Sequence, residues 1–276
     1  MHLTVFVWGF TAILGRLISV PAAALVWYRV LLVVLVMGGL VAWRRLPLFA
    51  VSPQRFFLAG ALAGVHWLFF YGCIKYAGVA VAVLCLSTTT FFTALVEPRV
   101  FRRRVDGREL ALGFGVMLGV GFLVKVETGT DLLGLSLGLS SAFFSAAFGA
   151  LNGRLAQEAR AEVLTLWEMG SALVVTSCFF ALRPADFVAP WVLPVRDVGL
   201  LLVLAIGCTV VPWLWSLRVL QTLKPYALAL AVSLETVYGM ALAYLLFPHE
   251  EALTWRFYLG TAVLLGLVLY NTWRRR

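Results

Sequence analysis

The fold is decided by one stretch, residues 198–217, which reads VGLLLVLAIGCTVVPWLWSL. It contains no charged residue, and a helix of about 20 mainly apolar residues is long enough to cross a hydrocarbon core of about 30 Å. Two further stretches of the same length, 77–96 and 132–151, are also free of charge. Such segments predict membrane-spanning helices rather than the buried helices of a soluble protein.

The rest of the chain extends this pattern. Hydrophobic residues make up 62% of the 276 positions and charged residues 13%, whereas a soluble domain is about half apolar and about a quarter charged. The candidate spans are 2–18, 22–43, 56–74, 77–96, 110–124, 132–151, 163–182, 198–217, 226–247 and 257–273. The first lacks the basic start and cleavage site of a signal peptide, so we expect a retained helix. The sequence predicts an all-α integral membrane protein with ten transmembrane helices and no soluble domain.

The formal charge of +9 is better explained by membrane topology than by binding to a nucleic acid, because Lys and Arg gather in the cytoplasmic loops of membrane proteins. A cytoplasmic N-terminus places six basic residues outside, namely Arg16, Lys75, Lys125, Arg183, Arg196 and Arg256. It places the larger set inside, namely Arg44, Arg45, Arg55, Arg99, Arg102, Arg103, Arg104, Arg108, Arg154, Arg160, Arg218, Lys224 and Arg274 to Arg276. We therefore expect a multi-pass protein of a bacterial inner membrane with both termini in the cytoplasm.

The four cysteines all fall inside predicted spans and form no pair at a metal-ligand spacing. This pattern favours neither a disulfide framework nor a metal site. We expect no metal and no cofactor.

Faint repeats divide the chain into two halves, 1–126 and 127–276. The triplet Gly15-Arg16-Leu17 recurs 138 residues later as Gly153-Arg154-Leu155. An offset of 146 pairs Ser87 with Ser233, Thr89 with Glu235, Thr90 with Thr236 and Phe92 with Tyr238. Since five helices per half is an odd number, the second half must enter the membrane in the opposite orientation. The sequence thus predicts two inverted five-helix repeats, and a substrate site between such repeats near mid-membrane.

Several short motifs, spread over nearly the whole chain, together resemble one family of membrane proteins. They are Val7-Trp8-Gly9-Phe10-Thr11, Trp27-Tyr28-Arg29, His66-Trp67-Leu68-Phe69-Phe70, Ile74-Lys75-Tyr76, the run Ser87 to Thr90 before Glu97-Pro98, Leu234-Glu235-Thr236-Val237-Tyr238 and His249-Glu250-Glu251. In these motifs the chain resembles the ten-helix branch of the drug/metabolite transporter superfamily, the EamA-type permeases, which includes exporters of amino acids and other metabolites. The resemblance implies a basket of ten helices around a central cavity that opens alternately to each side. Thr236 stands where the family usually has proline, so we expect a more regular ninth helix.

Three ionisable residues within spans are candidates for function, because a charge in a span is costly. Arg29 and Glu168 lie at similar positions in their halves and could pair, or each could reach water at a membrane face by snorkelling. Glu235 lies near the middle of its span, where it would carry a coupling proton or serve as a hydrogen-bonding link between helices.

Aromatic and hydroxyl side chains supply the remaining candidates for a small-molecule site. We predict that substrate is contacted by Trp8, His66, Trp67, Tyr71, Ser87, Thr90 and Tyr238. Ser87 and Thr90 share a helix face at i, i+3. Glycine pairs at i, i+4, such as Gly60 with Gly64, are expected to serve helix packing.

These patterns favour a secondary transporter that exports or exchanges an amino acid or similar metabolite, acts as a monomer and uses no ATP. Its partners would be the small-molecule substrate, a coupling proton and the lipid bilayer. A flippase for lipids or lipid-linked carriers is the alternative within the same superfamily. An intramembrane serine protease with Ser136 and His66 is a remote alternative, and no channel-type filter is visible in the sequence.

Overall fold

The computed structural model describes residues 2–48, 53–123 and 132–247, together with positions 255, 259, 262, 263, 266, 267 and 270. Helices and short connectors account for these residues, and none of them lies in a strand. The helices are α1 (His2–Leu17), α2 (Ala22–Trp43), α3 (Pro53–Ser87), α4 (Thr89–Val100), α5 (Gly107–Leu123), α6 (Leu132–Leu155), α7 (Ala161–Leu182), η1 (Pro184–Asp186), η2 (Pro190–Val192), α8 (Val195–Leu202), η3 (Val203–Val210), α9 (Val211–Leu220), α10 (Pro225–Val232) and α11 (Leu234–Leu246).

Within the described residues, six helical stretches are long and apolar enough to cross a membrane. They are Ala22–Trp43, Pro53–Ser87, Leu132–Leu155, Ala161–Leu182, Val195–Leu220 and Pro225–Leu246. The apolar helix α1 and helix α5 occupy two further predicted spans, and α4 completes the span 77–96 that begins in α3. The last predicted span, 257–273, lies largely outside the described residues. The all-helical membrane fold is confirmed at this level.

Helix α3 covers two of the predicted spans, and its helical conformation is interrupted between them by a kink at Gly78. The backbone there has φ 86° and ψ 172°. Glycine adopts such a positive φ without the steric cost that a Cβ would bring. Gly78 therefore marks the turn between the third and fourth predicted spans.

Two spans are broken near their middle, at Thr88 between α3 and α4 and at Ser233 between α10 and α11. The Ser87 hydroxyl donates to Leu84 O at 2.7 Å and the Thr88 hydroxyl to Cys85 O at 2.6 Å, which is the kind of local side-chain bond that competes with helix geometry. Thr236 lies within the helical segment α11, and the irregularity of the ninth span falls at Ser233, whose backbone keeps right-handed helical angles (φ −55°, ψ −24°).

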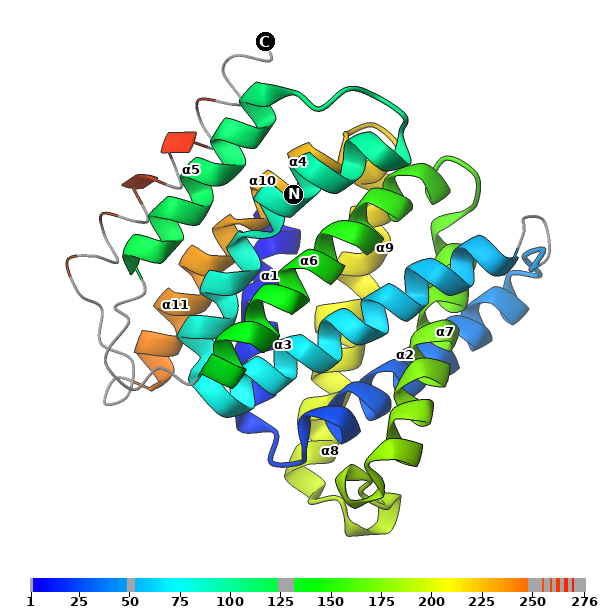
Figure 1. The fold of residues 1–276 in the computed structure, drawn as a ribbon. Helices are drawn as coiled ribbons and strands as arrows, with labels where there is room; N and C mark the ends of the chain where they lie inside the picture. Colours follow the sequence, from blue (N-terminus) through cyan, green and yellow to red (C-terminus); the bar gives the residue numbers. More distant parts are fainter. Residues whose placement is uncertain are drawn as a thin grey trace.

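Small residues bring the central helices together. A Cβ added to Gly60 would collide with the backbone of Glu168, and one added to Gly64 would press on Ala172, so α3 and α7 touch backbone to backbone. The packing role expected for this glycine pair is confirmed. Helix α3 also packs along α6, while α5 lies at one edge of the bundle and α2 with α7 at the opposite edge (Figure 1).

Arginines at or next to the ends of separate helices converge on one face of the bundle. Arg44, Arg160 and Arg218 surround Glu162, with nitrogen to oxygen distances of 3.3, 3.7 and 3.6 Å. Arg55 and Arg154 both approach Glu158 at 3.4 Å. We call this the basic face. It gathers residues that the sequence assigns to loops on one side of the membrane.

Candidate functional site

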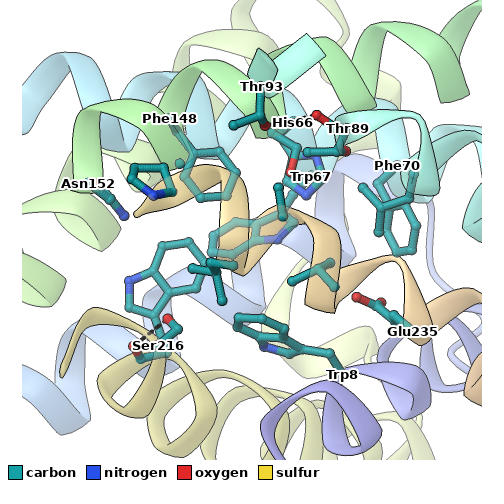
Figure 2. Close-up of a pocket in the computed structure, with 18 of the residues that line it drawn as sticks. Trp8, His66, Trp67, Phe70, Thr89, Thr93, Phe148, Asn152, Ser216 and Glu235 are labelled. Carbon is teal, nitrogen blue, oxygen red and sulfur yellow. Dashed lines mark hydrogen bonds between the residues drawn. The ribbon is translucent and has the colours of Figure 1, made fainter. Parts of the chain in front are cut away.

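A cavity lies between the helices, with a volume of about 110 Å³. One buried water needs roughly 10–15 Å³ on the same scale, so the cavity has room for a small organic molecule. Its lining comes mainly from α1, α3, α4, α6, α9, α10 and α11, and consists of Trp8, Thr11, Arg29, His66, Trp67, Phe70, Leu86, Thr89, Thr93, Ser145, Phe148, Gly149, Asn152, Trp213, Ser216, Leu220, Pro225, Leu228, Ala229, Val232 and Glu235 (Figure 2). This mixture of aromatic surface and few polar groups is typical of ligand sites.

Arg29 of α2 is held rigidly in the wall of this cavity. Its Nε donates to the Thr209 hydroxyl and its Nη1 to the Tyr71 hydroxyl, each at 2.8 Å, and its guanidinium carbon lies 4.3 Å from the centre of a Trp67 ring. The side chain is only 2% exposed, so it does not reach water at a membrane face. The described residues give Nη2 no hydrogen-bond partner, which leaves a charged donor for a ligand.

The segment that supplies Thr209 to Arg29 is irregular. Thr209 lies in the π-helical turn η3, where its hydroxyl donates to Leu204 O at 2.7 Å. π-Helical turns are rare and occur frequently at functional sites. Here the irregular turn presents the Thr209 oxygen to Arg29 Nε.

Glu168 of α7, the second charged residue predicted for the site, lies outside the cavity lining and has a different set of partners from Arg29. Its Oε2 accepts a hydrogen bond of 2.9 Å from Trp213 Nε1, and the residue is 1% exposed. No ion pair joins Arg29 and Glu168 in the described part of the chain. Their link is indirect, because the rings of Trp67 and Trp213 lie 5.3 Å apart between them.

Glu235 of α11 points into the cavity near Trp8 (Figure 2). It is 4% exposed, and Arg29 is close enough to act on its carboxylate electrostatically. No hydrogen bond to this carboxylate comes from the described residues. This geometry does not support Glu235 as a link between helices, and it leaves the carboxylate available to a proton or a ligand.

His66 forms part of an aromatic wall. Its Nδ1 lies 2.8 Å from the Ser141 hydroxyl and 2.9 Å from Ser141 O, and its ring stacks on Phe70 with a centroid distance of 6.0 Å. Ser136 is bound elsewhere, since its hydroxyl donates to Leu133 O at 2.8 Å. The pairing of Ser136 with His66 that a serine protease would need is not formed.

Four of the residues predicted to contact substrate lie outside the cavity lining. The Tyr71 hydroxyl accepts a hydrogen bond from Arg29 Nη1, and the Ser87 hydroxyl donates to a carbonyl of its own helix. The Thr90 hydroxyl lies 2.8 Å from that of Ser233 and joins α4 to the break after α10. Tyr238 packs its ring against Phe6 with a centroid distance of 5.5 Å.

The sequence interpretation missed the face of α6 that lines the cavity and carries two polar side chains. Ser145, Phe148, Gly149 and Asn152 all line the cavity. Their spacing of three to four residues is the period of one helix face and could have identified them. In the fourth predicted span the hydroxyls at the cavity belong to Thr89 and Thr93 of α4, and those of Ser87 at the end of α3 and of Thr90 lie outside the lining.

Comparison with known proteins agrees with this architecture. The model of the EamA-like transporter family matches residues 1–125 and 132–272. A solved structure titled "Crystal structure of protein" has a TM-score of 0.74 and 17% identity, covering 99% of this chain and 96% of that chain, so it shares the fold. No curated protein matches the chain. The chain belongs to the EamA-like transporter family and is a membrane transporter of the drug/metabolite transporter superfamily.

Proposed function

We propose that this transporter is a secondary carrier that exports or exchanges an amino acid or a similar small metabolite by alternating access. The observation that carries the proposal is the cavity, in which Arg29 and Glu235 are both buried and both retain unused binding capacity. Isolated charges inside a membrane bundle are costly and usually mark a substrate or ion pathway.

Each charged residue has a distinct proposed role. Arg29 Nη2 binds the substrate carboxylate, because a guanidinium offers a strong charge-assisted hydrogen bond to that group. Glu235, which lines the same cavity as Arg29, takes up or releases a coupling proton and receives the α-ammonium group of the substrate. Trp8, Phe70 and Phe148 enclose the substrate side chain.

Alternating access is supported by matched contacts at the two ends of the bundle. At one end Lys75 Nζ donates to Ile18 O. At the other end Gln221 Nε2 donates to Ala156 O at 3.3 Å. The offsets of 138 and 146 found in the sequence relate Ile18 to Ala156 and Lys75 to Gln221. We propose that the halves, about 1–126 and 127–276, are inverted repeats, each of which closes one end of the path.

The same reasoning supports an orientation in the membrane. The cavity lining reaches Asn152, Leu220 and Pro225, which lie beside the helix ends that carry the basic face. Basic residues gather in cytoplasmic loops, so we propose that this face is cytoplasmic, that both termini lie there, and that the cavity is oriented toward the cytoplasm. A bacterial inner membrane and a monomer, whose single bundle encloses the whole cavity, complete the proposal.

Counterflow in proteoliposomes tests this function. Vesicles containing the protein are loaded with one unlabelled amino acid or related metabolite at a time, and entry of the labelled counterpart is followed, with empty vesicles as the control. Transient accumulation of an amino acid is the expected result. No exchange across the panel would contradict an amino-acid carrier and would favour a lipid-type substrate.

A further inference from the structure

Two buried acceptor atoms beside the cavity have no hydrogen-bond partner in the described part of the chain. They are Asn152 Oδ1, which belongs to a residue of the cavity lining, and Glu168 Oε1, whose residue lies outside the lining and bonds to the lining residue Trp213. The side chains are 1% and 3% exposed, and the Asn152 amide interacts with the Glu168 carboxylate, so the two orphaned atoms belong to one cluster. Buried polar groups are nearly always satisfied, and an exception calls for an explanation such as a ligand that binds there.

The surroundings of this cluster favour an organic cation. A carboxylate offers about four lone-pair positions, of which Glu168 uses one for Trp213 Nε1 and another toward the Asn152 amide. The Trp213 ring stacks on Phe148 with centroids 5.5 Å apart, and aromatic faces attract ammonium groups. A bare metal cation would need more oxygen ligands than these two side chains provide.

The cluster lies apart from Arg29. Arg29 rests on Trp67, and Glu168 binds Trp213, so the contacting pair of indole rings separates the two charges. Trp67 and Trp213 differ by the same offset of 146 that relates the two halves, so each half contributes one tryptophan and one charge of opposite sign. Figure 2 shows Asn152 on the side of the cavity opposite Glu235.

We propose that Glu168 and Asn152 form a second subsite, which binds a primary ammonium group at the far end of the substrate. This inference rests on the proposed function and refines it. The α-carboxylate and α-ammonium groups of an amino acid share one carbon, so both bind at Arg29 and Glu235. Only a further amino group on the side chain reaches past the two tryptophans. The substrate class is therefore an amino acid with an amino group at the end of its side chain.

Lysine and norleucine test this subsite, because their side chains have the same carbon skeleton and differ in the terminal amino group. Counterflow of both is measured for the full-length wild-type protein, Glu168→Gln and Asn152→Ala. Glu162→Gln is the matched control, since Glu162 lies on the same helix at the basic face and away from the cavity. Norleucine exchange reports whether each variant is folded.

The wild type should exchange lysine in preference to norleucine. Glu168→Gln should lower the apparent affinity for lysine about tenfold or more, because a buried charged hydrogen bond is lost, and should leave norleucine exchange nearly unchanged. Asn152→Ala should act in the same direction, and Glu162→Gln should act on neither. Norleucine exchange without any lysine preference, or equal loss of both in Glu168→Gln, would overturn the subsite alone. Failure of the wild type to exchange either compound would also overturn the subsite, whereas the amino-acid carrier itself is overturned only when no amino acid of the counterflow panel is exchanged.

Discussion

At the scale of single residues, the site depends on which buried polar atoms have protein partners. Arg29 has two of its three nitrogens bound by Thr209 and Tyr71, which fixes the guanidinium and leaves one donor for substrate. The Glu235 carboxylate receives no hydrogen bond from the described residues. A carrier needs this combination, because a fully satisfied charge would bind substrate weakly and a mobile one would not fix its orientation.

Replacement of Arg29 tests the anion subsite. Arg29→Ala should lower the transport efficiency for a carboxylate substrate by at least tenfold, since a charge-assisted hydrogen bond is worth about 1.5–3 kcal/mol. Arg29→Lys should restore only part of it, because an ammonium cannot bind Thr209, Tyr71 and substrate in the guanidinium geometry. Initial rates of counterflow over a range of substrate concentrations measure the effect. Equal transport by Arg29→Ala and the wild type would remove Arg29 from the site.

Replacement of Glu235 tests proton coupling. Glu235→Gln removes the titratable group and keeps the size of the side chain. Uptake driven by an imposed pH gradient should fall to the rate without a gradient, while exchange at equal pH on both sides should continue. Radiolabelled uptake into proteoliposomes with and without the gradient measures both. A gradient response that persists unchanged in Glu235→Gln would assign coupling to another group.

At the scale of helices, the account depends on close packing and on breaks in regular structure. The α3 and α7 backbones meet at Gly60, which places Glu168 beside the cavity. Three spans lose regular α-helical geometry, at Thr88, η3 and Ser233. These spans contribute residues to the cavity wall or to the side chains that bind Arg29. Irregular backbone of this kind is tolerated at membrane depth where it is buried in protein or lines a cavity.

Enlargement of Gly60 tests the α3 to α7 contact. Gly60→Leu should destabilise the protein by about 1–3 kcal/mol through overpacking, and should reduce transport because Glu168 is displaced. Gly38→Leu on α2 is the control, since no atom lies within 4 Å of a Cβ added there. Thermal unfolding in detergent gives the comparison. Similar unfolding temperatures for the two variants would show that the contact does not limit stability.

At the scale of the whole molecule, one face collects the arginines and the cavity extends toward it. Thr222 lies in an exposed turn after α9 near that face, and Val192 lies in η2 beyond the opposite end of α7. In vesicles of known orientation, a membrane-impermeant thiol reagent should label Thr222→Cys only from the cytoplasmic side and Val192→Cys only from the other. The reverse pattern would invert the proposed orientation.

The membrane fold could be predicted from the sequence because about 20 apolar residues have few alternatives to a spanning helix. Five residues of the cavity lining could also be predicted, because polar or amphipathic side chains within apolar spans stand out. They are Trp8, Arg29, His66, Trp67 and Glu235. The rotation of α4 could not be predicted. Its run of neighbouring hydroxyls surrounds the helix, so composition alone does not separate Thr89 and Thr93 from Ser87 and Thr90. The irregularity at Ser233 could not be predicted either, because it is associated with a contact to Thr90, which lies in the other half of the sequence.

The central claim is that the substrate binds in the cavity between the two halves. Its most direct test is substrate protection of Ser145→Cys, a cavity position, in a protein whose four native cysteines are replaced by alanine. The rate of modification by a hydrophilic thiol reagent is measured with and without the amino acid that counterflow identifies, and Thr222→Cys serves as the control outside the cavity. The account predicts that substrate slows modification of Ser145→Cys severalfold and leaves Thr222→Cys unchanged. Equal rates at Ser145→Cys with and without saturating substrate would contradict it.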